Sequence, residues 1–128
     1  MQKGLGAMGK RILLVEDTAT MIMLEKMLLA GEGFEITTAG NGVEGLKKIE
    51  ASAPDLVLLD IMMPEMDGIE MCRQLKNNPE TAEIPVIMVT TQGEPERVEQ
   101  AFEAGCDDFV TKPIDKIELL EKIRSFLK

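Results

Sequence analysis

Histidine, tryptophan and tyrosine are all absent from this sequence of 128 residues. Without histidine, the chain cannot build a Ser-His-Asp triad or a histidine-based metal site. Aromatic residues make up only 3% of the composition, which leaves no platform on which bases could stack. No apolar run is long enough to span a bilayer, and no signal peptide with a cleavage site is present. We therefore expect a soluble cytoplasmic protein with no membrane association.

Basic residues are also scarce, with 14 against 23 acidic ones and a net charge of −9. A field of that sign repels phosphate backbones, so direct binding to nucleic acid is not expected. The two cysteines, Cys72 and Cys106, form no CxxC pair and are expected to be reduced, buried and without function. Residues 1–9 are rich in glycine and are interpreted as a flexible leader or an expression remnant, followed by one domain over residues 10–128.

The apolar pattern predicts five strands. Residues 12–15, 56–59 and 86–89 are each four consecutive apolar residues, as in strands buried on both faces of a parallel sheet. Residues 35–39 are mixed, as at a sheet edge, and residues 108–111 are the predicted last strand. Apolar residues between and after these segments recur at helical spacing. They are Met21, Leu24 and Leu28; Val43, Leu46 and Ile49; Met71 and Leu75; Val98 and Phe102; and Ile117, Leu120, Ile123 and Leu127.

This alternation of strand and helix predicts an α/β fold with a doubly wound parallel sheet and helices on both faces. The right-handed crossover rule leaves few topologies, of which the flavodoxin-like strand order 2-1-3-4-5 is the simplest for five strands.

Polar residues follow the predicted strands. Glu16 and Asp17 follow the first, Asp60 the third, Thr90 the fourth and Lys112 the fifth. The carboxyl ends of parallel strands share one edge, and the proposed order places the first and third strands at the switch point. We therefore expect the three acidic side chains to converge there.

Three neighbouring carboxylates would raise one another's pKa values unless a cation compensates them. Oxygen ligands without histidine or cysteine favour Mg²⁺. Such a metal, together with Lys112, can neutralise the charge of a transferred phosphoryl group. Asp60 is then the candidate nucleophile, and the Thr90 hydroxyl can donate to the new phosphate.

The chain resembles the receiver domains of bacterial two-component response regulators. The resemblance covers residues 10–128 and rests on residues 14–17, 60–68, Thr90 and 109–113. It implies a phosphoacceptor, not an enzyme that turns over an external substrate, whose partners are a sensor histidine kinase or phosphotransfer protein and an unknown downstream protein.

The resemblance also implies a role for each matching residue. Asp60 is the phosphorylation site, and Mg²⁺ is bound by Asp17, Asp60 and the backbone carbonyl of Met62, with Glu16 acting largely through water. Lys112 contacts the phosphoryl group, or Asp60 when no phosphoryl group is present, and the Lys112–Pro113 bond is cis.

The switch residues implied by the resemblance are Thr90 and Phe109, which act on the surface formed by the fourth helix, last strand and last helix. Phe102 and Ile117 also belong to this region, and we interpret them as ordinary core residues. Phe109 has no hydroxyl, so its switching would depend on packing alone.

Three residues near the implied site set expectations for the phosphoaspartate. Thr91 is bulky and is expected to narrow access to Asp60, while Met62 and Gln92 flank the position of the attacking water. Met62 offers no polar group to orient that water, so slow autodephosphorylation is expected.

Two alternatives remain open. Residues 40–45 match G-x-G-x-x-G between a strand and a helix, with Asp60 about 20 residues further on, as in a dinucleotide-binding domain. That reading places Glu44 where the pyrophosphate belongs. An aspartate-nucleophile phosphatase typically has a second aspartate two residues after the nucleophile, where this chain has Met62.

Overall fold

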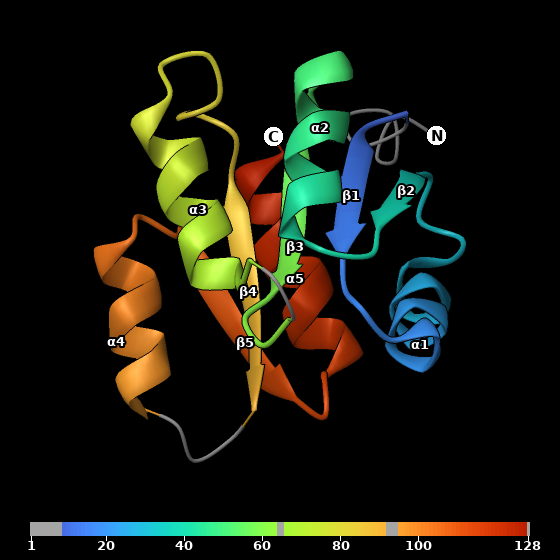
Figure 1. The fold of residues 1–128 in the computed structure, drawn as a ribbon. Helices are drawn as coiled ribbons and strands as arrows, with labels where there is room; N and C mark the ends of the chain where they lie inside the picture. Colours follow the sequence, from blue (N-terminus) through green and yellow to red (C-terminus); the bar gives the residue numbers. More distant parts are fainter. Residues whose placement is uncertain (1–8, 64–65, 92–94, 128) are drawn as a thin grey trace.

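The computed structural model describes residues 9–63, 66–91 and 95–127. Within these ranges the chain alternates strictly between strand and helix (Figure 1). The strands are β1 (Arg11–Val15), β2 (Glu35–Ala39), β3 (Leu56–Asp60), β4 (Val86–Thr91) and β5 (Asp108–Lys112). The helices are α1 (Ala19–Leu29), α2 (Gly42–Ala51), α3 (Gly68–Asn77), α4 (Pro95–Glu103) and α5 (Lys116–Phe126). The proposed leader lies almost wholly outside the described residues.

The sheet is parallel throughout and has the order β2-β1-β3-β4-β5, which confirms the predicted flavodoxin-like topology. Strands β3, β4 and β5 run one or two residues further than predicted. Asp60, Thr90 and Lys112 therefore belong to the ends of strands instead of the loops after them. We call the edge formed by these strand ends the carboxyl edge, and the opposite edge the amino edge.

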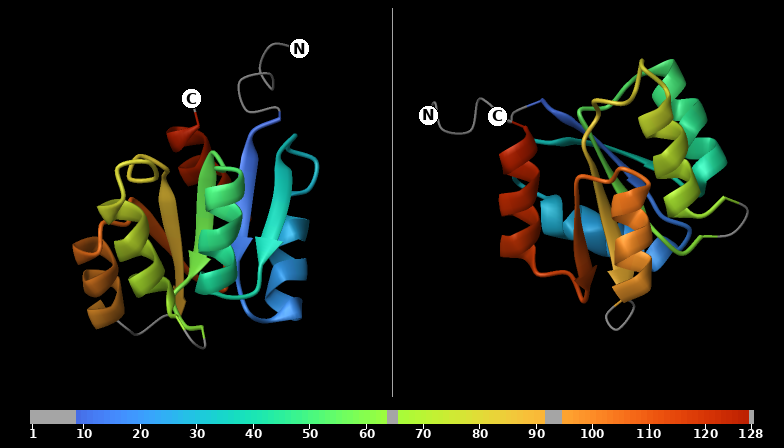
Figure 2. Two further views of the ribbon diagram at one scale, coloured as in Figure 1. Left: turned by 45° about the horizontal axis from the view of Figure 1, so that its top comes forward. Right: turned by 90° about the vertical axis from the view of Figure 1, so that its left-hand side faces the viewer.

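The sheet separates two apolar clusters, because alternate residues of a strand face opposite sides. Leu13, Val15, Val57 and Leu59 pack in a cluster with residues of α2, α3 and the end of α4. Their neighbours in the same strands, such as Leu14 and Leu58, pack with residues of α1 and α5. The right-hand view of Figure 2 shows α1 and α5 on one side of the sheet and the other helices opposite.

Several helices bury a different face from the one that their apolar spacing suggested. In α1 the buried residues are Glu25 and Leu29, while Leu24 is exposed. Phe102 is 45% and Ile117 is 69% exposed, so the interpretation of these two side chains as core residues is wrong. Each of their helices instead buries neighbouring positions, such as Ala101 in α4.

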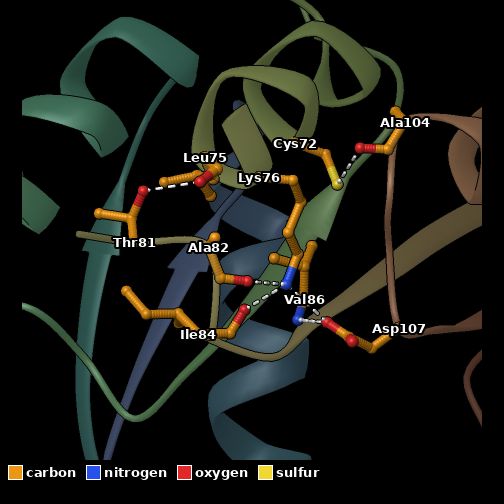
Figure 3. Close-up of polar contacts among 9 residues, drawn as sticks. All are labelled: Cys72, Leu75, Lys76, Thr81, Ala82, Ile84, Val86, Ala104 and Asp107. Carbon is orange, nitrogen blue, oxygen red and sulfur yellow. Dashed lines mark hydrogen bonds and ion pairs between the residues drawn. The ribbon is translucent and has the colours of Figure 1, made fainter. Parts of the chain in front are cut away.

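A network of polar contacts joins three segments at the amino edge (Figure 3). The Lys76 ammonium, on α3, donates to the carbonyls of Ala82 (3.0 Å) and Ile84 (2.7 Å) and to the Asp107 carboxylate (3.0 Å). The same Asp107 oxygen accepts the backbone N–H of Val86 at 2.8 Å. This network fixes the α3–β4 connection against the start of β5.

The two cysteines are free and buried, as expected. Burial raises the pKa of the Cys72 thiol to about 11 and that of Cys106 to about 12, which disfavours the reactive thiolate. Among the described helices, none is long and apolar enough to cross a membrane.

Candidate functional site

The structure brings together the acidic residues that follow β1 and end β3. One carboxylate oxygen from each of Glu16, Asp17 and Asp60 lies within 4.8 Å of the others. Glu16 and Asp60 are almost fully buried, at 1% and 4% exposure, whereas Asp17 is exposed. The convergence was predictable because β1 and β3 are neighbours in the sheet. Such a cluster has the oxygen ligands that Mg²⁺ prefers.

Lys112 supplies the nearby positive charge. Its ammonium lies 3.7 Å from Asp60 Oδ1, and its side chain remains 30% exposed. The strand register explains this position, since Lys112 pairs with Thr91 on β4, and β4 lies between β3 and β5. The Lys112–Pro113 peptide bond is cis, as the resemblance implied.

Burial, more than repulsion, sets the electrostatics of the acidic cluster. Burial raises the pKa of Asp60, while the Lys112 charge opposes the rise. Burial also raises the pKa of Glu16 to about 7, with a smaller contribution from the charge of Asp60. The raised pKa values were expected from the sequence as an effect of mutual repulsion, whereas burial is their main cause. A bound cation would compensate this clustered charge.

Glu16 is held in place by the turn into α1. Its Oε2 accepts from both the backbone N–H and the hydroxyl of Thr18, each at 3.1 Å. The Thr18 hydroxyl in turn caps the helix by accepting from the N–H of Met21. Thr18, not Asp17, is therefore the helix cap, which leaves Asp17 available at the mouth of the site.

The start of α3 lies directly against the backbone of Asp60. A Cβ atom at Gly68 would lie 2.9 Å from the carbonyl carbon of Asp60 and equally close to the Cα of Ile61. Only glycine fits at such a distance. Asp67 caps α3 by accepting from the N–H of Glu70 at 2.9 Å. The Asp-Gly pair thus positions a helix beside the phosphoacceptor candidate.

Thr90 and Phe109 share the side of the sheet that faces α4. Met88, which packs on that side, precedes Thr90 by two residues and pairs with Phe109. Thr90 is 3% exposed, and its hydroxyl makes a long contact of 3.5 Å to the Thr91 carbonyl. The Phe109 ring meets Phe102 edge to face at 5.8 Å. A packed path therefore leads from β4 through Phe109 to the exposed Phe102.

Glu25 is a residue near this site that the sequence analysis missed. It is buried on α1, and its pKa is raised to about 8 by burial, with further contributions from the charges of Glu16 and Asp60. The sequence contained one signal for this residue. Glu25 is an acidic residue directly after Leu24, in a helix with apolar residues on most of its sides, so it could face the interior.

The candidate nucleotide site at residues 40–45 is folded as an ordinary helix start. Asn41 caps α2 by accepting from the N–H of Glu44 at 2.8 Å. The Glu44 carboxylate accepts from the N–H of Gly40 at 2.6 Å, which lowers its pKa. A carboxylate thus takes the place that a pyrophosphate would need, which argues against nucleotide binding.

A family model described as "Response regulator receiver domain" matches residues 12–124. The chain belongs to this family. Receiver domains are generally non-enzymatic signalling domains of two-component systems; they bind Mg²⁺ at an acidic pocket and interact with histidine kinases or phosphotransfer proteins. The fold and the family expected from the sequence are therefore confirmed.

Similar proteins include complete regulators and isolated receivers. The receiver domain is 41% identical over 122 residues to the response regulator PleD of Caulobacter vibrioides, which covers 94% of this chain but 27% of that protein. It is 37% identical to the regulator PhoB of Rhizobium meliloti, with 92% and 52% covered. The chain therefore spans between a quarter and about half of the length of these curated relatives.

Solved structures show the same fold over nearly the whole of both compared chains. A putative response regulator from Chloroflexus aurantiacus superposes with a TM-score of 0.90 at 31% identity, covering 93% of this chain and 98% of that one. The signal receiver domain of a histidine kinase from Syntrophus aciditrophicus gives 0.87 at 37% identity, with 93% and 90% covered.

Proposed function

We propose that this receiver domain, over residues 10–128, takes part in a phosphorelay by accepting a phosphoryl group on Asp60. The observation that supports this most directly is the meeting of Asp60 with Glu16 and Asp17 within 4.8 Å and with Lys112 at 3.7 Å. The donor would be a phosphohistidine on a sensor kinase or a phosphotransfer protein. An Asp60 carboxylate oxygen attacks phosphorus, the bond between phosphorus and the imidazole nitrogen breaks, and the histidine leaves.

The acidic residues fit a magnesium ion. Asp17 and Asp60 would hold it through their side chains, Met62 through its carbonyl and Glu16 largely through water. When bound, Mg²⁺ supplies charge neutralisation for the phosphoryl oxygens and for the clustered carboxylates. Lys112, which pairs with Asp60 in this structure, would shift to a phosphoryl oxygen as the new charge appears.

Thr90 and Phe109 would carry the signal to the surface. The Thr90 hydroxyl has only a weak contact at 3.5 Å, so a phosphoryl oxygen would offer it a better partner. Phe109 would then fill the space that Thr90 leaves and change its contact with Phe102. Because Phe102 and Ile117 are exposed, the α4–β5–α5 surface offers apolar side chains to a downstream protein. A Thr90→Ala variant should still accept a phosphoryl group on Asp60, but phosphorylation should no longer change its binding to the downstream protein.

Phosphorylation is tested with Mg²⁺ and acetyl phosphate, a small phosphodonor. Intact mass spectrometry should show the addition of one phosphoryl group to the wild type and none to Asp60→Asn. The variant Asp55→Asn, which alters an aspartate at the amino edge, should still be phosphorylated. Phosphorylation of Asp60→Asn to the same extent would refute the assignment.

We also propose that the phosphoaspartate is long-lived. The Met62 side chain is 51% exposed beside the site and has no group to orient an attacking water. Thr91 is exposed at the end of β4, while Gln92 lies outside the described residues. Replacing Met62 by Asn should shorten the lifetime of the phosphorylated form, measured by loss of the added mass. A wild-type lifetime of seconds would contradict the proposal.

A further inference from the structure

Strand β2 forms one side of the sheet, where no further strand follows it among the described residues (Figure 1). The N–H of Glu35 donates to the Lys10 carbonyl, so every second residue from Glu35 onward bonds toward β1. The residues between them, Ile36 and Thr38, therefore direct their N–H and C=O groups away from β1. We call this the outer side of β2. An unpaired strand side of this kind is a template for the addition of another strand.

Lys48, on α2, occupies one of these outward groups. Its ammonium donates to the Thr38 carbonyl and also pairs with Glu44 at 3.5 Å. Both side chains of that ion pair are nearly half exposed, so another carboxylate can replace Glu44 at little cost. The other outward groups, on Ile36 and Thr38, have no hydrogen bond to any described residue. Lys48 therefore protects only part of the outer side of β2.

A hollow of about 260 Å³ adjoins β2 on the face of the sheet that α2 covers. Leu13 and Thr37, which pair in the strand register, line it from the sheet, and Leu13 packs toward α2. Ala51 and Pro54 line it from the end of α2 and the turn that follows. Sites for drug-sized ligands usually measure about 300 to 1,000 Å³, so this smaller and largely apolar hollow suits a single large side chain.

Two cations, Arg11 and Lys48, also line the hollow. The Arg11 guanidinium donates to the carbonyls of Ser52 (3.2 Å) and Ala53 (3.1 Å). It forms no ion pair among the described residues, although Glu35 is its partner in the strand register. No acidic side chain belongs to the described lining of the hollow. In a chain of net charge −9, this place favours a carboxylate from another molecule.

We propose that the outer side of β2 and the adjoining hollow form a docking site for an extended acidic segment of a partner protein. The segment adds to the sheet as a strand that bonds to Ile36 and Thr38, while one large apolar side chain enters the hollow. A carboxylate of the segment pairs with Arg11 or with Lys48, and Lys48 then leaves the Thr38 carbonyl to a backbone N–H of the segment. Main-chain hydrogen bonds supply the affinity of such contacts, and the pocket supplies their specificity. The site requires no phosphoryl transfer to Asp60, so it goes beyond the proposed function.

The geometry of a strand defines a probe for this site. Side chains two positions apart share one face of a strand, so the acidic residues should lie two positions from the apolar one. A suitable probe is the peptide acetyl-Thr-Asp-Thr-Phe-Thr-Asp-Thr-amide. One control peptide has asparagine in place of both aspartates. A second control is N-methylated at the phenylalanine and at both of its neighbours, which removes the backbone donors needed for strand addition and keeps the side chains.

The experiment titrates the ¹⁵N-labelled full chain with each peptide and follows the backbone amide signals by NMR. The probe should shift the signals of residues 36–38 and 51–53 until they saturate, with a Kd of about 1 mM or lower. The asparagine peptide should bind about fivefold more weakly, because it lacks the charge. The N-methylated peptide should bind at least about tenfold more weakly, because it cannot pair with β2.

Variants of the chain test the two parts of the site. Thr38→Pro removes an outward N–H and no hydrogen bond to β1, which is the position at which an edge strand tolerates proline. It should raise the Kd for the probe about tenfold. Lys48→Gln should raise this Kd about threefold. Lys47→Gln is the matched control, because Lys47 is exposed on α2 and does not line the hollow, and it should keep the Kd within about twofold.

Three results would overturn the inference. The first is the absence of saturable shifts with the probe at concentrations up to about 5 mM. The second is equal binding of the probe and the N-methylated peptide, and the third is an equal effect of Lys48→Gln and Lys47→Gln. The peptides and the lysine variants decide the question even if Thr38→Pro does not fold. Sedimentation of the protein without peptide adds a last test, since self-association that Lys48→Gln strengthens would assign the outer side of β2 to a second copy of this chain instead.

Discussion

The two edges of the sheet use charged residues in opposite ways. At the amino edge, Lys76 and Asp107 are satisfied by one another and by backbone groups at 2.7 to 3.0 Å. At the carboxyl edge, the Lys112–Asp60 pair is longer, at 3.7 Å, and the buried Oε1 of Glu16 has no hydrogen-bond partner among the described residues. Charged groups whose hydrogen bonds are all made within the protein stabilise the fold. Charged groups that lack such partners can instead gain them from a bound ligand, which favours binding. The difference indicates which edge is structural and which is functional.

The largest effect is expected from Gly68→Ala at the carboxyl edge. The added methyl group would collide with the backbone of Asp60 and Ile61, neither of which can move without disturbing β3. We expect a loss of about 3 kcal/mol in the free energy of unfolding and about a hundredfold slower phosphorylation by acetyl phosphate. Urea denaturation and the rate of mass increase measure the two effects.

Gly40→Ala is the matched control, since this glycine also lies at the carboxyl edge of the sheet, directly after β2. A Cβ there would meet only the flexible end of the Glu44 side chain, at 3.4 Å. A Gly68→Ala protein that resembled this control would show that α3 does not constrain Asp60.

Lys76→Met should cost less stability and leave the site intact. The change removes three hydrogen bonds and leaves the Asp107 carboxylate without its cation. We expect the free energy of unfolding to fall by about 2 kcal/mol, with an unchanged Kd for Mg²⁺ in the folded protein. Lys47→Met, at an exposed position on α2, should change stability by less than about 0.5 kcal/mol. A weakened Mg²⁺ affinity in Lys76→Met would break the division between the edges.

The pH dependence of stability should come from the carboxyl edge. Glu16, Glu25 and Asp60 have raised pKa values in the folded protein, mainly because of burial. At pH values between the ordinary pKa values of the unfolded state and the raised pKa values of the folded state, the folded state binds more protons. The free energy of unfolding must therefore fall as pH rises through this range. Without metal, we expect a loss on the order of 2 kcal/mol between about pH 5 and pH 8.

Urea unfolding in the presence of a chelator measures this slope, and added Mg²⁺ should reduce it by compensating the carboxylates. Asp60→Asn removes one titrating group and should flatten the curve. Stability that was constant or rising over the same range would show that the acids are not buried as described.

The smallest effect is expected from Arg11→Lys at the amino edge. The Arg11 guanidinium donates to the carbonyl of Ala53 at 3.1 Å and to the carbonyl and hydroxyl of Ser52, all in exposed positions. Water can replace these partners, so we expect a loss below about 1 kcal/mol by thermal or urea unfolding. A loss of stability as large as that of Lys76→Met would mean that burial does not determine how strongly a contact at this edge stabilises the fold.

The sequence was sufficient for the sheet and for the convergence of the acids. Apolar runs such as residues 56–59 indicate buried strands. The strand order then brings Asp60 and Glu16 together, because β1 and β3 are neighbours whatever the exact ends of the strands. Helix faces were less predictable. In α1, apolar residues occur on most sides, so the pattern could not show that Glu25 faces inward and Leu24 outward.

The amino-edge network was also invisible in the sequence. Lys76 and Asp107 are 31 residues apart and belong to no motif, and their contact depends on the path of the α3–β4 connection. The main cause of the raised pKa values of Glu16 and Asp60, which is burial, could not be predicted from the sequence either. Residue spacing indicates which side chains are neighbours but not how far they are shielded from solvent.

The edge-to-face contact of Phe102 with Phe109 has a practical consequence. The chain contains four phenylalanines and neither tyrosine nor tryptophan, so fluorine-labelled phenylalanine would give a spectrum of only four resonances. One of these rings lies in β5 on the side facing α4, and its neighbour is partly exposed on α4. The receiver therefore has a natural position for a spectroscopic reporter between the interior and the surface, and conversion between two conformations could be followed by fluorine NMR without changing the sequence.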